Sequence, residues 1–355
     1  MAIRQQIRMC TARDGARLAY AVTGGGTPLV KVGNWLTHLE FDLQSPVWGY
    51  LIEALSQDHQ LWRYDQRGTG LSDWDVDRYD FDDQVNDLEC VIDAAGLKRF
   101  ALLCVSQGTP VGIAYAVRHP ERVTHLVIHG GYARGRRRRS DDPKAVETAD
   151  TMLKLVELGW GRNDPSWRQF FTTQFIPGGT PEQHDWFNEL QRISTSPANA
   201  VRMLRGFEAV DITPLLSQVQ CPTLVLHATG DLRVPFAEAR RLVGGIPGAR
   251  LVPLASANHL MVPGDPTWPA WREEVRDFLG SVRGEADARF AALSPREREL
   301  VELMAQGRDN AQIAASMGLS EKTVRNHITS VFAKLEVENR AQAIVRARGA
   351  GFGAA

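Results

Sequence analysis

Three polar side chains that could together carry out acyl transfer each stand shortly after an apolar run of the length of a buried strand. They are Ser106, Asp231 and His259. In such a set a serine attacks a carbonyl carbon, a histidine takes the serine proton, and an aspartate fixes the imidazole tautomer. Because parallel sheets place their sites at the carboxyl ends of strands, we expect these three side chains to meet at one edge of a sheet.

Each of these three motifs also has a simpler explanation. Ser106 stands between a strand pattern at residues 100–105 and a helix pattern that begins at Gly108, and such a sharp turn exposes the hydroxyl beside a helix N-terminus. A serine in a strand-to-helix turn is common, however, and a lone histidine is more often a hydrogen-bonded loop residue. The order of the three motifs, each at a strand end, favours an assembled triad.

The elements that must position these residues alternate along residues 1–280. Short, mostly apolar runs, typical of strands covered on both faces, lie at residues 29–32, 60–64, 100–105, 125–129, 223–227 and 251–254. Helix-like segments lie near residues 48–55, 81–95, 108–119, 236–243 and 271–279. Residues 7–9 and 16–22 are typical of an antiparallel hairpin at the sheet edge. The pattern predicts an α/β fold with a mainly parallel, doubly wound sheet.

Between about residues 133 and 212 the strand pattern stops, and aromatic residues occur at uneven spacing. An inserted helical cap over the serine and histidine would explain this segment and would enclose a mostly apolar ligand pocket. The residues that we expect to line this pocket are Trp35, Phe41, Trp160 and Trp186. The alternative is that the aromatic rings of the inserted segment fill the core of the cap itself.

The order Ser106, Asp231, His259 resembles that of the α/β-hydrolase fold. The turn Asp-Gln-Arg-Gly-Thr-Gly-Leu-Ser at residues 65–72 is similar to the turn that this family carries after its second buried strand, and the resemblance covers roughly residues 15–280. It implies an α/β-hydrolase fold with a helical cap, in which these three residues form the catalytic triad.

The same resemblance implies an oxyanion hole. One donor would be the backbone N–H of Gln107, and the second would be an N–H near Asn34 or Trp35. Two features depart from the family pattern. Cys104 stands where the family usually has a glycine two positions before the serine, and the loop at residues 33–38 lacks the usual His-Gly pair. Cysteine is small enough for the turn to form, although the backbone approach is tighter.

Residues 293–355 contain four short helix patterns, at residues 294–306, 310–317, 321–335 and 340–347. Their ends carry capping signals. Ser294 and Glu297 form a capping box around a proline at the first helical position. Gly318 permits a tight turn, and Ser320 caps the third helix. The segment therefore predicts a small all-α domain.

The third of these helices has an apolar face and a polar face. The apolar face consists of Val324, Ile328, Val331, Phe332 and Leu335. The polar face consists of Lys322, Thr323, Arg325, Asn326, Thr329 and Lys334. A short helix, a glycine-containing turn and a helix with basic and amide side chains outward are typical of a helix-turn-helix. The alternative is a helical bundle that only dimerises, which needs no basic outward face.

The segment resembles the LuxR-type DNA-binding domain through motifs at residues 293–300, 319–327 and 339–343. The spacing between these motifs matches that family without an insertion or deletion. The resemblance implies that Arg325, Asn326 and Thr329 read bases. It also implies that Lys322, Thr323 and Lys334 contact phosphates. The chemistry agrees, because arginine can bind guanine and asparagine can bind adenine through two hydrogen bonds each, whereas lysine and hydroxyl groups suit phosphates.

The composition of the 355 residues narrows the other possibilities. The length suits two domains, and a small, polar segment at residues 281–292 is the expected linker. Four single cysteines lack metal-type spacing, so we expect reduced thiols, no metal and no cofactor. No apolar run could span a bilayer, so we expect a cytoplasmic protein without membrane contact. The arginine run at residues 134–139 is typical of a solvated loop, with a phosphate-contacting patch as the alternative.

Together these features predict a DNA-binding transcriptional regulator. We expect a hydrolase-like sensor domain at residues 1–280 with its cap at about 133–212, and a helix-turn-helix domain at residues 293–355. The sensor domain would bind, and could hydrolyse, a small, largely apolar ligand. Double-stranded DNA and a second copy of the chain are the other expected partners, because one reading helix gives little affinity. The alternative is an active serine esterase or lactonase whose helical tail serves targeting or oligomerisation.

Overall fold

The computed structural model describes residues 4–76, 78–140, 143–162, 164–350 and 352–353. The chain divides into two compact units, Met1–Val275 and Arg276–Ala355. None of the described helices is both long enough and apolar enough to cross a membrane.

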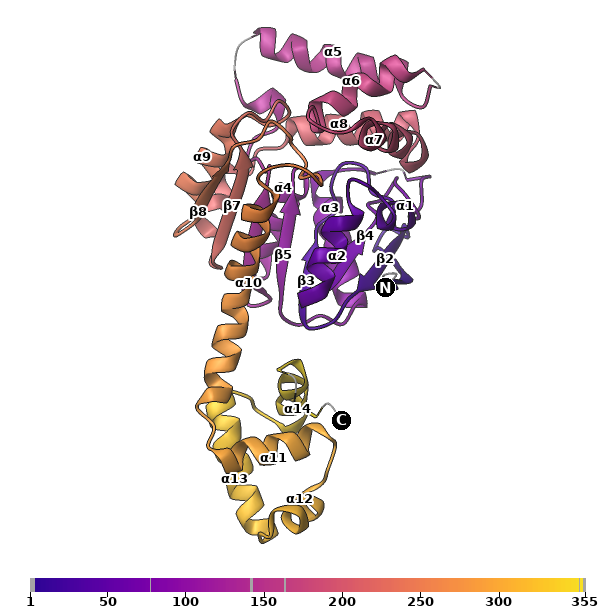
Figure 1. Cartoon of the computed structure of the whole chain (residues 1–355). Coiled ribbons are helices and arrows are strands. Elements are labelled where there is room, and N and C mark those ends of the chain that lie inside the picture. Colours follow the sequence, from indigo (N-terminus) through magenta and orange to yellow (C-terminus); the bar gives the residue numbers. More distant parts are fainter. Residues whose placement is uncertain (1–3, 77, 141–142, 163, 351, 354–355) are drawn as a thin grey trace. The chain divides into compact units, whose positions relative to one another are not determined.

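The first unit is built on an eight-stranded sheet (Figure 1). In chain order its strands are β1 (Gln6–Thr11), β2 (Arg17–Thr23), β3 (Thr27–Lys31), β4 (His59–Tyr64), β5 (Phe100–Val105), β6 (Val123–His129), β7 (Thr223–Ala228) and β8 (Arg250–Leu254). They lie side by side in the order β1-β2-β4-β3-β5-β6-β7-β8. β2 pairs antiparallel with β1 and β4, and all other neighbours are parallel. The predicted mainly parallel α/β sheet is confirmed.

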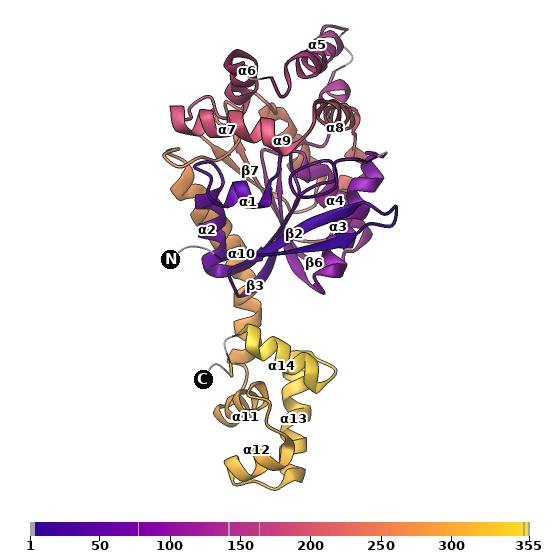
Figure 2. The ribbon, with the colours of Figure 1, turned by 90° about the vertical axis from the view of Figure 1, so that its right-hand side faces the viewer.

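Helices cover both faces of this sheet. They are α1 (Leu39–Leu43), α2 (Gly49–Asp58), α3 (Phe81–Ala94), α4 (Gly108–Arg118), α9 (Phe236–Gly245) and α10 (Trp268–Ala291). Figure 2 shows α2 and the start of α10 on one side of the sheet, and α3 and α4 on the other. Helix α1 has no counterpart among the predicted helices, because five residues are too few to show a helical period.

The segment between β6 and β7 is helical, as the sequence predicts for a cap. It consists of η1 (Arg136–Arg138), α5 (Pro143–Gly159), α6 (Pro165–Phe175), α7 (Pro181–Ser194), α8 (Pro197–Ala209) and η2 (Thr213–Gln218). Helices α6, α7 and α8 each begin with a proline in the first turn after a capping side chain, supplied by Asp164, Thr180 and Ser196. Figures 1 and 2 show α5 to α8 gathered beyond one end of the sheet.

Helix α10 is longer than predicted. The sequence suggested a helix end at Gly280 and a linker at residues 281–292, but α10 continues to Ala291. The continuing segment contains alanine, glutamate and arginine, which favour helices, and it contains no proline. A glycine costs a helix only about 1 kcal/mol, so Gly280 and Gly284 do not end it.

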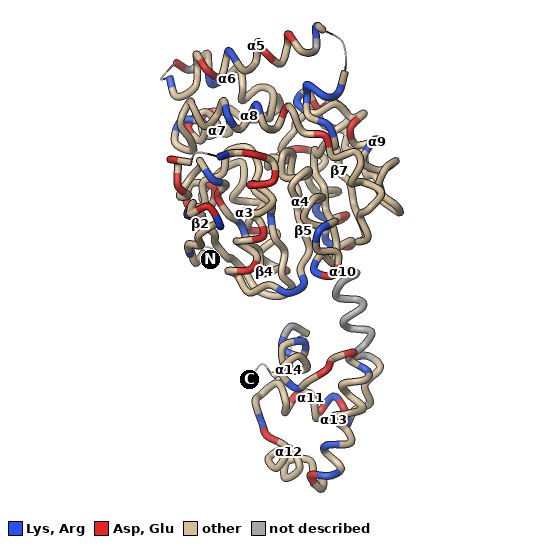
Figure 3. Tube along the Cα trace, turned by 180° about the vertical axis from the view of Figure 1, so that it is seen from behind, with Lys and Arg blue, Asp and Glu red and all other residues tan. Residues whose placement is uncertain are grey.

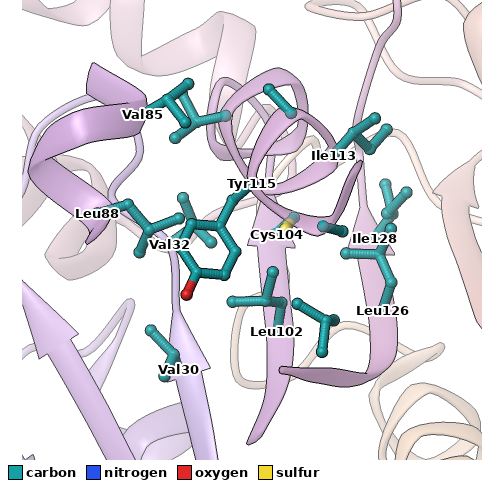
Figure 4. Packing of buried hydrophobic residues seen from close by; sticks show 14 of the residues in the cluster. Val30, Val32, Val85, Leu88, Leu102, Cys104, Ile113, Tyr115, Leu126 and Ile128 are labelled. Atoms are coloured by element: carbon teal, nitrogen blue, oxygen red, sulfur yellow. The ribbon is translucent and has the colours of Figure 1, made fainter. Parts of the chain in front are cut away.

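The core of the first unit lies between the central strands and the helices α3 and α4, as Figure 4 shows. Val30, Leu102 and Ile128 come from three neighbouring strands, and Val85 and Tyr115 come from the two helices that cover them. All six residues of β5 are buried, because helices cover both faces of the sheet. Full burial of one such aliphatic side chain contributes about 1.5–3 kcal/mol. This packing fixes the end of β5, which carries Ser106.

The chain compensates for the cysteine at position 104 with a glycine on the facing helix. Cys104 is fully buried at the end of β5, and Gly112 of α4 lies opposite it. A Cβ atom added at Gly112 would lie 2.2 Å from the Cys104 Sγ, well inside van der Waals contact. The close approach of α4 and β5 that the elbow requires is therefore kept. The glycine that allows it is Gly112 on the helix, instead of a glycine at position 104 on the strand.

We expect Gly112→Ala to destabilise the first unit by about 1–3 kcal/mol, because it overpacks a buried contact. Cys104→Ala in the same chain should restore most of this loss, since the next atoms around the added Cβ are 3.4 Å or more away. Urea unfolding followed by tryptophan fluorescence measures both changes, because all nine tryptophans precede residue 276.

Gly244→Ala is the matched control, because Gly244 is also helical and an added Cβ there meets no atom within 4 Å. It should be neutral or stabilise the protein by about 0.5–1 kcal/mol. Equal effects of alanine at positions 112 and 244, or no recovery with Cys104→Ala, would contradict the compensation.

The second unit contains the four predicted helices, α11 (Pro295–Ala305), α12 (Asn310–Met317), α13 (Glu321–Leu335) and α14 (Arg340–Gly349). The side chains of Ser294, Asp309, Ser320 and Asn339 cap their N-termini. Gly318 adopts φ 66° at the turn between α12 and α13, a left-handed conformation that suits glycine. A core of its own holds these helices together, with Leu300, Ile313, Val324 and Val331 almost fully buried. The predicted helical domain is confirmed.

Candidate active site and nucleic-acid interface

The three residues predicted as a triad are in hydrogen-bonding contact. The Oγ of Ser106 lies 2.8 Å from Nε2 of His259, and Nδ1 of His259 lies 2.7 Å from Oδ2 of Asp231. Ser106 and His259 are each 1% exposed. Because a carboxylate can only accept, Nδ1 carries the imidazole proton, and Nε2 then accepts from the serine hydroxyl. This is the tautomer in which a histidine can take a proton from serine.

Asp231 is held in its charged form by the groups around it. Its Oδ1 accepts the backbone N–H groups of Arg233, at 2.7 Å, and of Val234, at 2.9 Å. Burial by itself raises the pKa of this carboxyl, but the electrostatic interaction with His259 and the hydrogen bonds outweigh burial and leave the pKa below its usual value. An ionised Asp231 is what the tautomer of His259 requires.

Two residues that the sequence analysis missed hold His259 in place. Nε2 of His129 lies 3.1 Å from the backbone oxygen of His259, and the indole N–H of Trp271 donates to Nδ1 of His129 at 3.2 Å. Burial lowers the pKa of His129 to about 3, and the electrostatic interactions with His259 and His227 act in the same direction, so this imidazole is neutral and donates through Nε2. No local pattern marks this role, because His129 ends β6, 130 residues before His259.

The turn that carries Ser106 has the strain of a sharp strand-to-helix elbow. Ser106 adopts φ 50°, a left-handed conformation that a non-glycine residue rarely takes. Its N–H donates to the His129 backbone oxygen at 3.0 Å, which fixes the turn to the end of β6. Gly108 allows the first turn of α4 to approach the neighbouring loop, since an added Cβ would lie 3.0 Å from the Gly33 oxygen. The hydroxyl therefore stands beside the N-terminus of α4.

The predicted oxyanion donors differ in their availability. Within the described part of the chain, the backbone N–H groups of Asn34 and Gln107 donate to no acceptor. The N–H of Trp35, in contrast, donates to Oε1 of Gln107 at 3.0 Å. The Asn34 side chain accepts from Lys31 and donates to the Trp35 oxygen. Of the two alternatives for the second donor, the geometry favours Asn34 over Trp35.

A small cavity, partly open to solvent, lies beside Ser106. Among the described residues its lining consists of Ser106, Gln107, Tyr132, Arg136, Arg139, Phe207, Glu208, Arg233 and Val234. This lining differs from the mostly apolar pocket that we predicted, because three arginines and a glutamate belong to it. The cap supplies these charged groups from η1 and the end of α8, and the loop after β7 supplies Arg233.

The four aromatic residues predicted to line the pocket do not belong to this lining, because they pack on other rings. The ring of Trp35 packs edge to face on the ring of Trp160, with 5.5 Å between the ring centroids. It also packs edge to face on Phe207, which does line the cavity, with 6.1 Å between the centroids. Phe41 of α1 stacks on Trp186 of α7 at 4.8 Å. The aromatic residues thus join the cap to the rest of the first unit, which is a packing role close to the alternative considered for them.

The arginine run at residues 134–139 is not a fully solvated loop, because four of its five arginines are partly buried. In Figure 3 it is the blue stretch that comes just before α5 in the chain. Arg136 and Arg139 line the cavity, and Arg137 pairs with Asp150 and with Glu208, whose Oε2 lies 3.6 Å from the Arg137 Nε. The cap folds this run back onto the first unit, which the local sequence pattern could not reveal.

The predicted DNA-reading face of α13 is open to solvent. Lys322, Arg325, Asn326, Thr329 and Lys334 are exposed, and Thr323 is partly exposed. The opposite face packs into the core of the second unit through Val324, Ile328, Val331 and Leu335. Arg325 and Asn326 carry side-chain groups that can reach base edges. Within the described residues, the side chain of Arg325 makes only an ion pair with Glu321 at 3.7 Å.

Two of the predicted phosphate contacts are also engaged within the unit. Nζ of Lys334 lies 2.7 Å from Oε2 of Glu297, and the Thr323 hydroxyl lies 2.9 Å from the Ser320 hydroxyl. Glu297 also accepts from the Ser330 hydroxyl, at 2.9 Å. Lys334, the N–H of Ser294 and the Ser330 hydroxyl lower the pKa of Glu297 from 4.5 to about 2, against the opposing effect of burial. Lys334 therefore ties α13 to α11.

The depressed pKa of Glu297 predicts an acid-sensitive second unit. A carboxyl whose folded pKa is below its unfolded value stabilises the fold above about pH 4.5 and loses this contribution as the pH falls towards 2. We expect Glu297→Gln to cost about 1–3 kcal/mol at pH 7 and to flatten this part of the pH dependence. Hydrogen-exchange protection of α11 and α13 measures the stability of the second unit. Tryptophan fluorescence would not, because all the tryptophans lie in the first unit.

Glu299→Gln is the control, because Glu299 is exposed on the same helix. This substitution should leave the hydrogen-exchange protection of α11 and α13 unchanged, both at pH 7 and at acidic pH. The same loss for both variants at pH 7 would contradict a structural role for Glu297.

Comparison with known proteins agrees with both halves of this description. Residues 41–266 match the family described as alpha/beta hydrolase fold, and residues 291–347 match the bacterial regulatory proteins of the luxR family. The AB hydrolase superfamily protein YisY of Bacillus subtilis is 28% identical over 249 residues, which are 66% of this chain and 86% of that protein.

Two solved structures are also similar. A hydrolase from Pseudomonas aeruginosa is 24% identical with a TM-score of 0.63, covering 78% of this chain and 98% of that one. The esterase RhEst1 from Rhodococcus is 25% identical with a TM-score of 0.59, covering 79% of this chain and 99% of that one. The chain therefore belongs to the α/β-hydrolase fold family and carries a C-terminal domain of the luxR family of bacterial regulatory proteins, which implies DNA binding and a regulatory role.

Proposed function

We propose that this protein is a transcription regulator whose affinity for DNA responds to a small acyl compound bound beside Ser106. In this proposal residues 293–355 bind the duplex, and residues 1–280 hold the ligand. The observation that supports it most is the contact of Ser106, His259 and Asp231 beside a cavity, in a chain that also carries a luxR-family domain. A ligand-sized site and a DNA-reading helix in one chain suit a regulator that needs no separate sensor.

The chemistry available at the ligand site is acyl transfer. Ser106 Oγ bonds to the carbonyl carbon while its proton passes to Nε2 of His259, and Asp231 stabilises the imidazolium that forms. The N–H groups of Gln107 and Asn34 stabilise the negative charge that develops on the carbonyl oxygen. The leaving group then takes the proton from His259, and a water repeats the sequence to release the acyl group. Hydrolysis of the ligand would end the signal that its binding started.

Control of DNA binding requires that the ligand binds two states of the chain with different affinity. A tenfold difference in the affinity for DNA corresponds to a coupling of about 1.4 kcal/mol. We further propose that the protein binds DNA as a homodimer, because two half-sites about one helical turn apart supply the affinity that one reading helix lacks. Helix α14 is the candidate interface, since Val345 is 72% exposed there and Ala341 is exposed as well.

The second candidate is an active serine esterase or lactonase whose helical tail serves targeting or oligomerisation. The hydrogen-bonding distances of the triad favour it, because they suit catalysis without rearrangement. Both candidates share the site and differ in what the second unit does.

The test uses the full chain and duplexes selected from a random library. Sequence-specific binding whose affinity an acyl compound changes by about tenfold supports the regulator. Serine-dependent ester turnover at about 1–1000 per second, together with no binding to any selected duplex, would assign the protein to the second candidate.

A further inference from the structure

Three arginines surround the cavity beside Ser106. Arg136 and Arg139 reach it from the segment that follows β6, and Arg233 reaches it from the loop that follows β7. Arg139 lies over the ring of Tyr132 at 5.1 Å, which fixes its position, and the guanidinium of Arg233 lies over an aromatic ring of α6 at 5.3 Å. The arginines come from two distant parts of the chain, so only the fold brings them together.

Within the described part of the chain, none of these three guanidinium groups has a carboxylate oxygen within 4.0 Å, although the charge of Glu208 acts on Arg136 and Arg233 from farther away. The two buried glutamates of this region pair with other arginines. Glu208 is 3.6 Å from the Nε of Arg137, and Glu238 pairs with Arg241 at 3.1 Å. The guanidinium of Arg136 makes no hydrogen bond to a described residue. The Arg136 guanidinium is therefore available to a ligand, whereas Arg139 already donates through Nε to the Arg134 backbone oxygen at 2.8 Å.

The lining carries an excess of positive charge. Arg136, Arg139 and Arg233 stand against a single carboxylate, Glu208, in the described lining. Burial and the neighbouring Arg136 lower the pKa of Arg233 to about 10, which reports like charges crowded in a poorly solvated space. Arginine stays protonated at neutral pH all the same. An anion placed among these groups would relieve their mutual repulsion.

Glu208 does not cancel this excess. It is 3% exposed, and neither of its carboxylate oxygens accepts a hydrogen bond from a described residue. A buried acceptor without a donor is costly, so Glu208 also suits a ligand that brings a donor such as a hydroxyl group. The cavity thus offers several cationic donors and one acceptor, next to a serine nucleophile.

We propose that the ligand bound beside Ser106 is an acyl compound that also carries a carboxylate, which Arg136, Arg139 and Arg233 bind. The inference rests on the proposed function in taking this cavity as the ligand site. A planar carboxylate matches the paired N–H donors of a guanidinium group better than a neutral group does. This ligand class replaces the largely apolar ligand that the aromatic residues suggested.

The test compares two esters that differ in one group. Monomethyl succinate has a carboxylate where methyl butyrate has a methyl group. Binding of each to the full-length Ser106→Ala protein, which prevents turnover, is measured by ligand-detected NMR titration. We expect monomethyl succinate to bind at least about tenfold more tightly, the size expected of one charge-assisted contact.

Two substitutions in the charged lining should change the preference for the anionic ester in opposite directions. Arg136→Met should lower the preference for the anionic ester about tenfold, whereas Glu208→Gln should raise it, because it removes a negative charge beside the arginines. Arg138→Met is the matched control, since Arg138 belongs to the same run, is exposed and does not line the cavity. It should leave the preference unchanged, and thermal melting checks that each variant is folded.

Equal affinity for the two esters, no binding of either at millimolar concentration, or the same loss in Arg136→Met and Arg138→Met would overturn the inference. The anion site and the proposed function can fail independently. The proposed function is tested by measuring how the wild-type chain binds a selected duplex. If the anionic ester is preferred but neither ester changes DNA affinity or acylates Ser106, the proposed function fails and the anion site stands. If a neutral ester alone changes DNA affinity, the anion site fails and the regulator stands.

Discussion

Replacing Ser106 with alanine is expected to lower kcat for an activated short-chain ester by about 10⁴- to 10⁶-fold, to the level of the oxyanion hole and binding alone. The reason is geometric: the Ser106 Oγ lies 2.8 Å from the only nitrogen of His259 that can take its proton. Asp231→Asn should lower kcat about 10⁴-fold, because an amide at this position no longer selects the required imidazole tautomer. Release of p-nitrophenol from its acetate ester by the full chain, with mass spectrometry of the acylated protein, measures both.

Ser194→Ala is the matched control for this prediction. Ser194 is as buried as Ser106, and its hydroxyl has no hydrogen-bond partner among the described residues. It lies in α7 of the cap and takes no part in the triad, so turnover should stay within about twofold of the wild-type value. A wild-type rate no higher than that of Ser106→Ala would show that the assembled triad does not turn over, and the site would then serve ligand binding alone.

Arg325→Ala is expected to weaken binding to a selected operator by about 1–3 kcal/mol, or roughly 5- to 150-fold, and to relax base choice at one position. Arg325 is exposed on α13, and a guanidinium group there can donate two hydrogen bonds to a guanine edge. Fluorescence anisotropy with the operator and with single-base variants separates the loss of affinity from the loss of specificity. An unchanged preference among the variants would show that another face of α13 reads the bases.

Lys322→Ala is the comparison for a phosphate contact. It should weaken binding to all duplexes alike and reduce the salt dependence of the affinity by about one unit of slope. Lys334→Ala is a less clean test, although Lys334 is also a predicted phosphate contact. Its removal would break the contact with Glu297 at 2.7 Å and would loosen α13 from α11, so a loss of DNA binding would have two causes.

The local signals in the sequence were sufficient for most of the elements and for the order of the triad, although they missed α1 and the true end of α10. Strands covered on both faces appear as short apolar runs, and the capping boxes at Ser294 and Asp309 mark helix ends, because these signals depend on neighbouring residues only. The positions of Ser106, Asp231 and His259 follow in the same way, since strand ends in a parallel sheet share one edge. Their mutual contact was a prediction from topology.

The sequence by itself therefore determined the two kinds of domain, most of the elements and the residues that could do chemistry. Only the tertiary structure decided what surrounds those residues. Arg136 and Arg233 face one cavity although almost a hundred positions separate them, Gly112 makes room for Cys104, and His129 orients His259. The physical reason is that burial, charge crowding and close packing depend on which distant side chains meet, and local periodicity carries no information about such meetings.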